Sequence, residues 1–154
     1  MAMRETTQIR MKIAIAIYLI LGLVDLVMGF IYLTTDRFLS YHAEAVGIPW
    51  REIDSGMQTL ILALMKLAGG GWLALGLLTI VLAAGLLIKN HALARWAVPA
   101  GTIVFWAASF MATWSVYQAT GAQTPWAPSL GAIGMAIIAM TIDAPWSSRN
   151  RRRD

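Results

Sequence analysis

Four long, nearly uncharged apolar blocks dominate this sequence and restrict what it can fold into. They cover residues 11–33, 57–88, 92–120 and 127–143. Each block reaches or approaches the roughly 20 residues that a helix needs to cross a ~30 Å hydrocarbon core. Backbone groups in lipid must bond internally, and no alternating ten-residue strands are present, so these blocks predict helices. The sequence therefore predicts an all-α integral membrane four-helix bundle, with residues 1–154 forming a single transmembrane domain.

The composition excludes several other classes of protein. Only 13% of the 154 residues are charged, about half the share typical of a soluble domain. Cysteine is absent, which excludes thiolate catalysis, disulfide exchange, iron–sulfur ligation and cysteine-based zinc sites. The first block is too long for a signal peptide, contains Asp25 and precedes no cleavage site, so it predicts a retained span.

The positions of the basic residues predict the orientation of the bundle. Basic side chains precede the first span, separate the second from the third and follow the fourth: Arg4, Arg10, Lys12, Lys89, Arg95, Arg149, Arg151, Arg152 and Arg153. The positive-inside rule therefore predicts both termini in the cytoplasm. This clustering at span ends accounts for the net charge of +4 without nucleic acid as a partner. The basic tail, residues 147–154, predicts binding of anionic lipid headgroups at Arg149–Arg153.

The longest connection, residues 34–56, is predicted to face the outside. It contains Phe38, Tyr41, His42, Ile48 and Trp50 among polar residues. This content indicates a short interfacial helix lying on the outer surface between spans one and two.

Two charged residues, Asp25 and Lys66, fall inside apolar spans, where an ionisable side chain is a candidate functional group. Counted from the outer ends of their spans, both lie about 12–14 Å deep, which favours an ion pair. Counted from the inner ends, Lys66 instead lies near the outer interface, where it can extend its ammonium group to water. The pair as structural glue, the pair as a ligand or proton site, and separate placements all remain open. At the end of span four, Asp143 predicts a structural ion pair with Lys89, Arg95 or Arg149.

Small and polar residues share faces of the predicted helices. Glycines accompany each charge, which predicts close packing of spans one and two through Gly22, Gly29, Gly69, Gly70 and Gly76. If the protein instead binds a ligand, the cavity is predicted to be lined by Asp25, Lys66, Gln58, Tyr18 and the hydroxyl groups of span three.

His42 and Glu44 are candidate acid and base groups in the outer loop. Their alternate spacing does not place them on one face of a helix, so they do not indicate a metal site. The other histidine, His91, is predicted on the opposite side of the membrane, which excludes a bis-histidine haem or metal site within one chain. No metal and no cofactor is predicted.

One set of motifs resembles a known group of proteins. The motifs are Phe38-x-x-Tyr41-His42, Gly47-x-x-Trp50, Gln58, and Met65-Lys66-x-x-Gly-Gly-Gly-Trp-Leu-x-x-Gly76. They resemble small bacterial four-helix inner-membrane proteins that are loosely similar to the DoxX-like group, over about Gly22 to Leu78, and this resemblance implies a bacterial inner membrane as the location. The resemblance implies a glycine-rich second helix after an outward loop, and it implies no catalytic residue.

Three functions follow as hypotheses. The first is an accessory, assembly or scaffold subunit that acts through helix packing, in a homo-oligomer or with other membrane subunits in the lipid bilayer. The second is a small homo-oligomeric transporter or ligand-binding bundle that uses Asp25 and Lys66. The third is a membrane enzyme acting on a quinone or a lipid through His42 and Glu44, although the lack of an evident nucleophile favours a protein that is not an enzyme.

Overall fold

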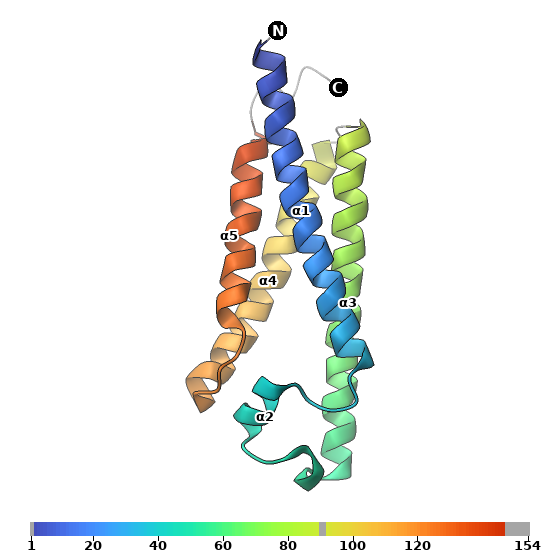
Figure 1. Cartoon of the computed structure of the whole chain (residues 1–154), viewed down its shortest axis with the longest axis vertical. Coiled ribbons are helices and arrows are strands. Elements are labelled where there is room, and N and C mark those ends of the chain that lie inside the picture. The colour runs from blue at the N-terminus through green and yellow to red at the C-terminus, as the bar shows by residue number, and fades with distance from the viewer. Residues whose placement is uncertain (1, 90–91, 147–154) are drawn as a thin grey trace.

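The computed structural model of the chain describes residues 2–89 and 92–146, and the side chains of residues 8–85 and 93–146. The helices, in chain order, are α1 (Ala2–Thr34), α2 (Ser40–Val46), the 3₁₀ helix η1 (Trp50–Glu52), α3 (Ser55–Lys89), α4 (Ala92–Thr120) and α5 (Trp126–Asp143) (Figure 1). No strand occurs within these ranges, so the all-α prediction is confirmed. The predicted lipid-binding tail, Arg149–Arg153, lies outside the described residues.

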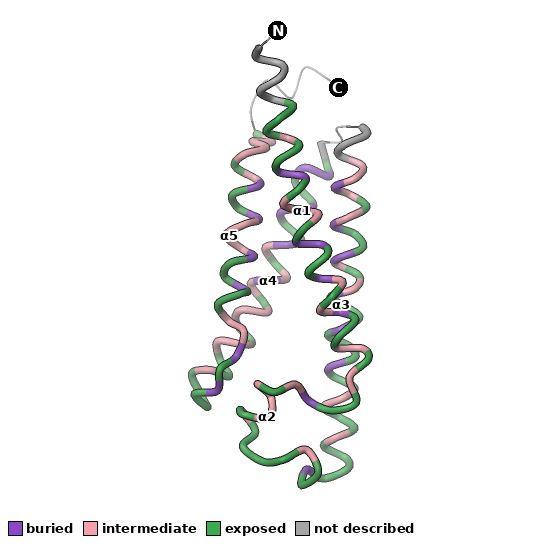
Figure 2. Tube along the Cα trace, viewed as in Figure 1, coloured by how far each residue is buried: buried purple, intermediate pink, exposed green. Residues whose placement is uncertain are grey.

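Four of these helices are long and apolar enough to cross a membrane. The apolar segments are residues 8–34, 55–85, 93–120 and 126–143, close to the predicted spans. Large apolar side chains also point away from the bundle: Phe30 is 66% exposed, Val81 64% and Val104 70%. Exposed residues lie along the described length of every long helix (Figure 2). Helices that are apolar all round are typical of membrane spans.

The long helices alternate in direction and pack mainly as two pairs, α1 with α3 and α4 with α5 (Figure 1). Smaller contacts of α1 with α5 and of α3 with α4 close the ring. We call the end where α1 begins and α5 finishes the termini end, and the opposite end, which carries α2 and η1, the loop end. The two pairs diverge toward the loop end, where α2 lies between them (Figure 1).

Four glycines allow α1 and α3 to approach each other closely. A Cβ atom on Gly22 would lie 3.2 Å from the carbonyl oxygen of Gly76, and one on Gly76 would lie 2.8 Å from that of Gly22. Gly29 and Gly69 meet in the same reciprocal way, at 2.9 and 3.1 Å. Gly70 differs from the prediction, because a Cβ there would meet nothing within 4 Å. It follows the buried Gly69 by one residue, and successive side chains on a helix point about 100° apart.

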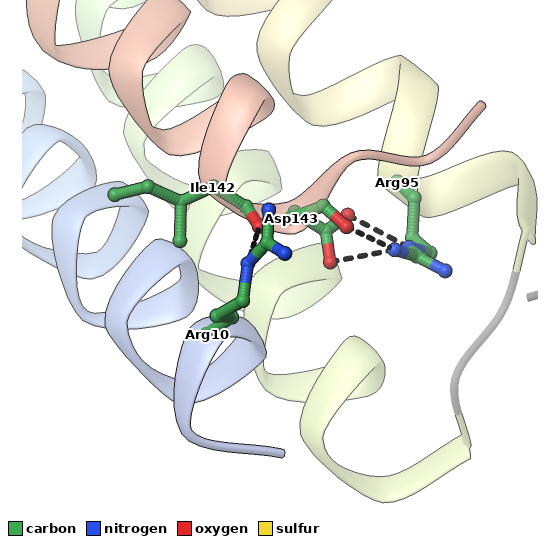
Figure 3. A network of polar contacts seen from close by, with 4 residues as sticks. All are labelled: Arg10, Arg95, Ile142 and Asp143. Carbon is green, nitrogen blue, oxygen red and sulfur yellow. Dashed lines mark hydrogen bonds and ion pairs between the residues drawn. The ribbon is translucent and has the colours of Figure 1, made fainter. Parts of the chain in front are cut away.

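At the termini end, a buried ion pair joins α4 to the end of α5. The Arg95 guanidinium donates from Nε to Oδ2 of Asp143 and from Nη2 to both Oδ1 and the backbone carbonyl oxygen, each at 2.7 Å. Arg10 of α1 donates from Nε to the carbonyl oxygen of Ile142 at 3.0 Å. These contacts fasten three helices together (Figure 3). Asp143 therefore pairs with Arg95, one of its three proposed partners, whereas Arg149 and the side chain of Lys89 lie outside what the structure describes.

Candidate functional site

A cavity of about 570 Å³ lies in the loop half of the bundle. Its walls come from all four long helices, and α2 contributes to its opening. The cavity exists where the two helix pairs diverge and where small residues line the gap, namely Ala68, Gly71, Ala108 and Ala112. This volume is in the range of small-molecule sites, about 300–1,000 Å³.

Three aromatic side chains that contact one another form part of the cavity wall. Trp72 of α3 packs edge-on against Phe105 and Trp106 of α4, with ring centroids 4.6 and 4.7 Å apart. Such T-shaped pairs hold aromatic side chains in defined orientations. The wall therefore offers flat apolar surfaces to an occupant.

Hydrogen-bonding side chains line the part of the cavity nearest α2, which we call its mouth. The hydroxyl groups of Tyr32 and Tyr41 bond to each other, and the Tyr41 ring lies 4.0 Å from that of His42. His42 Nδ1 accepts a 3.3 Å hydrogen bond from the Leu39 backbone N–H, so a neutral imidazole carries its proton on Nε2. Burial lowers the pKa of His42 and raises that of Tyr41, so both groups are neutral at pH 7. The mouth thus presents hydrogen-bonding groups without charge.

The loop that forms the mouth is fastened on two sides. Glu44 accepts a 3.0 Å hydrogen bond from the backbone N–H of Gln123, in the link between α4 and α5. On the other side, Gln58 of α3 donates to the carbonyl oxygen of Trp50 at 2.7 Å, and Phe38 packs edge-on against the Trp50 ring. Gln58 therefore holds the loop in place. It was predicted to line a ligand cavity, but it is not among the residues that line this one.

His42 and Glu44 have separate roles in this arrangement. His42 lines the cavity, whereas Glu44 is exposed and bonded to the α4–α5 link. Neither donates to nor accepts from the other in the described residues, so the structure does not assemble the acid–base pair that the enzyme hypothesis needs. No group of three or more His, Asp or Glu side chains within these ranges is placed to hold a metal ion.

Hydroxyl groups on the facing sides of α4 and α5 are mostly occupied by backbone carbonyls. Thr113 donates to the carbonyl oxygen of Ser109 at 2.9 Å, Thr124 to that of Thr113 at 2.7 Å, and Ser129 to that of Pro125 at 3.2 Å. The three donors, Thr113, Thr124 and Ser129, all line the cavity, and Thr124 does so from the link between α4 and α5. Their oxygens still have lone pairs available, so they remain acceptors on an otherwise apolar wall.

The ion pair proposed between Asp25 and Lys66 does not form. Asp25 is fully buried and its carboxylate oxygens have no hydrogen-bond partner among the described residues, whereas Lys66 is exposed. The glycine contacts explain the separation, because a register with Gly29 opposite Gly69 sets Lys66 level with Tyr32. Tyr32 is seven residues from Asp25, or about 10 Å along the helix. Lys66 also points away from the interface, since the neighbouring Met65 is the buried residue.

Tyr18, predicted to line a ligand cavity, lies elsewhere in the bundle. Its side chain is buried in the apolar core of the termini half, together with Val98 and Ala139. It does not contribute to the cavity. Trp72, Phe105 and Trp106, in contrast, form the cavity wall, and their apolar character within apolar helices gave no sequence signal for a site.

Comparisons with known protein families, with curated proteins and with solved structures found no match to this chain. The resemblance to the DoxX-like group therefore stays a prediction.

Proposed function

We propose that this protein is a multi-pass protein of a bacterial inner membrane that binds a lipophilic molecule in the cavity at its loop end. The cavity carries this proposal, because it combines apolar aromatic walls with uncharged hydrogen-bonding groups at one opening. A single chain supplies walls from four helices, so the ligand-binding hypothesis needs neither a second copy nor the Asp25–Lys66 pair. A role as an accessory subunit is compatible with such binding.

We propose that the loop end faces the outside and that both termini are cytoplasmic. Among the described residues, the termini end carries Arg10, Lys12 and Arg95. Flanking basic residues favour retention on the cytoplasmic side of a membrane. The cavity would then open in the outer half of the bilayer, where a ligand dissolved in lipid can reach it.

The chemistry of the mouth narrows the class of ligand. The tyrosine hydroxyls and the Nε2–H of His42 can donate hydrogen bonds, and none of the described residues that line the cavity is a lysine or an arginine that could pair with an anionic headgroup. Burial of an unpaired charge is costly, which disfavours a charged headgroup. We therefore infer a ligand with an apolar body and a neutral oxygen acceptor, such as an ester or a ketone.

The test uses methyl palmitate with a photoreactive diazirine on its acyl chain, added to the protein in lipid nanodiscs. We expect saturable labelling of cavity residues such as Met28 and Ala112, which excess unlabelled methyl palmitate suppresses. In Gly71→Leu, we expect at least a tenfold loss of this labelling. The added Cβ would rest 3.4 Å from the Phe105 ring, in ordinary contact, and the rest of the leucine would occupy the cavity.

Gly70→Leu is the matched control, because it makes the same change one residue away on the same helix. Gly70 faces open space and does not line the cavity, so its variant should label as the wild type does. Labelling confined to lipid-facing residues such as Val104 and Met111, or equal labelling of the two variants, would contradict the proposed function.

A further inference from the structure

A second group of polar atoms lies deeper in the bundle, and the proposed ligand site does not use it. Both carboxylate oxygens of Asp25, Oγ1 of Thr102, Nε1 of Trp106 and the Tyr18 hydroxyl are buried without a hydrogen-bond partner in the described residues. Asp25 and Thr102 are both fully buried. Most buried polar groups in proteins are hydrogen-bonded, so such a set requires an explanation.

Asp25 lies directly behind the cavity wall. Its neighbours on α1, Val24 and Met28, line the cavity, and so does Trp106. The indole N–H of Trp106 interacts with the Asp25 carboxyl group without reaching hydrogen-bond geometry. Thr102 is one helical turn from Trp106 on the same face of α4. One indole ring therefore separates the buried carboxyl group from the cavity.

No described cation neutralises Asp25. On α3, Lys66 is exposed and about 10 Å nearer the loop end. On α4, Arg95 is bonded to Asp143 of α5 at the termini end. On α1 itself, Tyr18 is two turns away from Asp25. Tyr32 of α1 and Tyr41 and His42 of α2 line the mouth of the cavity. An ionised carboxylate in such surroundings would be strongly disfavoured.

The unpartnered atoms fit a proton better than a metal ion. Only the two oxygens of Asp25 and the hydroxyl of Thr102 are available at this level, whereas Ca²⁺ and Mg²⁺ require about six or more oxygen ligands. A proton makes the carboxyl group neutral and gives it one donor in addition to its acceptor oxygen. The indole N–H of Trp106 can then donate to that acceptor.

We propose that Asp25 is a proton-binding site whose protonation is linked to occupancy of the cavity. When the cavity is empty, Asp25 is mostly protonated, but water beside Trp106 can accept the proton from a fraction of the molecules and solvate the carboxylate that remains in them. When a lipophilic ligand displaces that water, the carboxyl group keeps its proton. Ligand binding therefore favours the protonated form, and by linkage protonation favours ligand binding. The linkage to ligand binding rests on the proposed function, whereas the assignment of Asp25 as a proton-binding site does not.

Infrared spectroscopy of the wild type tests the proton site without any ligand. At neutral pH we expect the carbonyl band of a protonated carboxylic acid, absent in Asp25→Asn and retained in Asp36→Asn, whose side chain is 91% exposed. Trp106→Phe keeps an aromatic wall but removes the indole donor, so it should shift the band, whereas Trp96→Phe at the surface should not. A missing band, or a band that persists in Asp25→Asn, would overturn the proton site. The shift in Trp106→Phe provides the test if Asp25→Asn does not fold.

Binding measurements with methyl palmitate test the linkage. We expect the wild-type affinity to fall as the pH rises, by at most about tenfold per pH unit for one linked proton. We expect Asp25→Asn to bind with no such dependence, and saturating methyl palmitate to strengthen the wild-type carbonyl band. An equal pH dependence in both proteins would refute the linkage. Absence of binding would refute it together with the proposed function, whereas the ligand-free band would still decide whether Asp25 holds a proton.

Discussion

Replacing Gly29 with alanine is expected to lower the free energy of unfolding by about 3 kcal/mol, the upper part of the range for overpacked sites. The added Cβ would lie 2.8 Å from the backbone nitrogen of Leu73 and 2.9 Å from the carbonyl oxygen of Gly69. These are backbone atoms of α3, so rotation of a side chain cannot relieve the contact. The two helices must separate, and the reciprocal contact between Gly22 and Gly76 is strained with them.

Gly70→Ala is the matched control for this substitution. It adds the same methyl group to the same interfacial region, but the new Cβ would meet nothing within 4 Å. Because alanine favours helix by up to about 1 kcal/mol over glycine, this variant should be as stable as the wild type or slightly more so. The measurement is the loss of helical circular dichroism in mixed micelles as the fraction of denaturing detergent rises. Equal stability of the two variants would contradict the close approach of α1 and α3.

The long helices could be predicted from the sequence because their length follows from apolar composition. The second and fourth spans were expected to begin at residues 57 and 127, and the helices begin at Ser55 and Trp126. The first helix begins at Ala2, well before the expected residue 11. Hydropathy reports the apolar part of a helix and not the helix itself, so a polar first segment is missed. The short helix in the loop was expected in part of residues 34–56 and is found as α2.

The relative heights of Asp25 and Lys66 depended on the register between two helices, which composition does not contain. Depth counted from the span ends left two placements open, because α3 extends beyond α1 at the loop end (Figure 1). A usable signal was present in the glycines. Gly22 and Gly29 are seven residues apart, as are Gly69 and Gly76, and pairing them in antiparallel order sets Lys66 level with Tyr32.

The cavity and the neighbour of Asp25 could not be found by any periodicity along the chain. The cavity arises because the α1–α3 and α4–α5 pairs diverge, which depends on how the whole bundle packs. Asp25 of α1 meets Trp106 of α4 across the bundle interior. Along the chain, these two helices are separated by α2, η1 and the whole of α3. An apolar helix contains many aromatic residues, so only the fold distinguishes those that line a site.

Replacing Arg95 with methionine is expected to cost about 3–5 kcal/mol of stability, the range for breaking a buried ion pair by removing one partner. Arg95 is 6% exposed and its partner Asp143 is 8% exposed. Loss of the guanidinium leaves a buried carboxylate without its ion pair and removes the donor to the Asp143 carbonyl oxygen. Arg95→Lys should fall between the wild type and methionine, because an ammonium group cannot reproduce the planar two-nitrogen contact.

The double variant Arg95→Met/Asp143→Leu separates the contribution of the pair from the cost of breaking it. Replacing both partners of a buried ion pair with apolar residues is often neutral, so the double variant should recover most of the stability lost in Arg95→Met. The recovery should be incomplete, because the backbone carbonyl at position 143 still lacks its donor. Arg37→Met serves as the control, since Arg37 and Asp36 are 72% and 91% exposed and their nearest charged atoms are 3.8 Å apart. If Arg95→Met were no less stable than Arg37→Met in the same detergent titration, α4 and α5 would not be joined by a buried ion pair, and the termini end would depend on apolar packing alone.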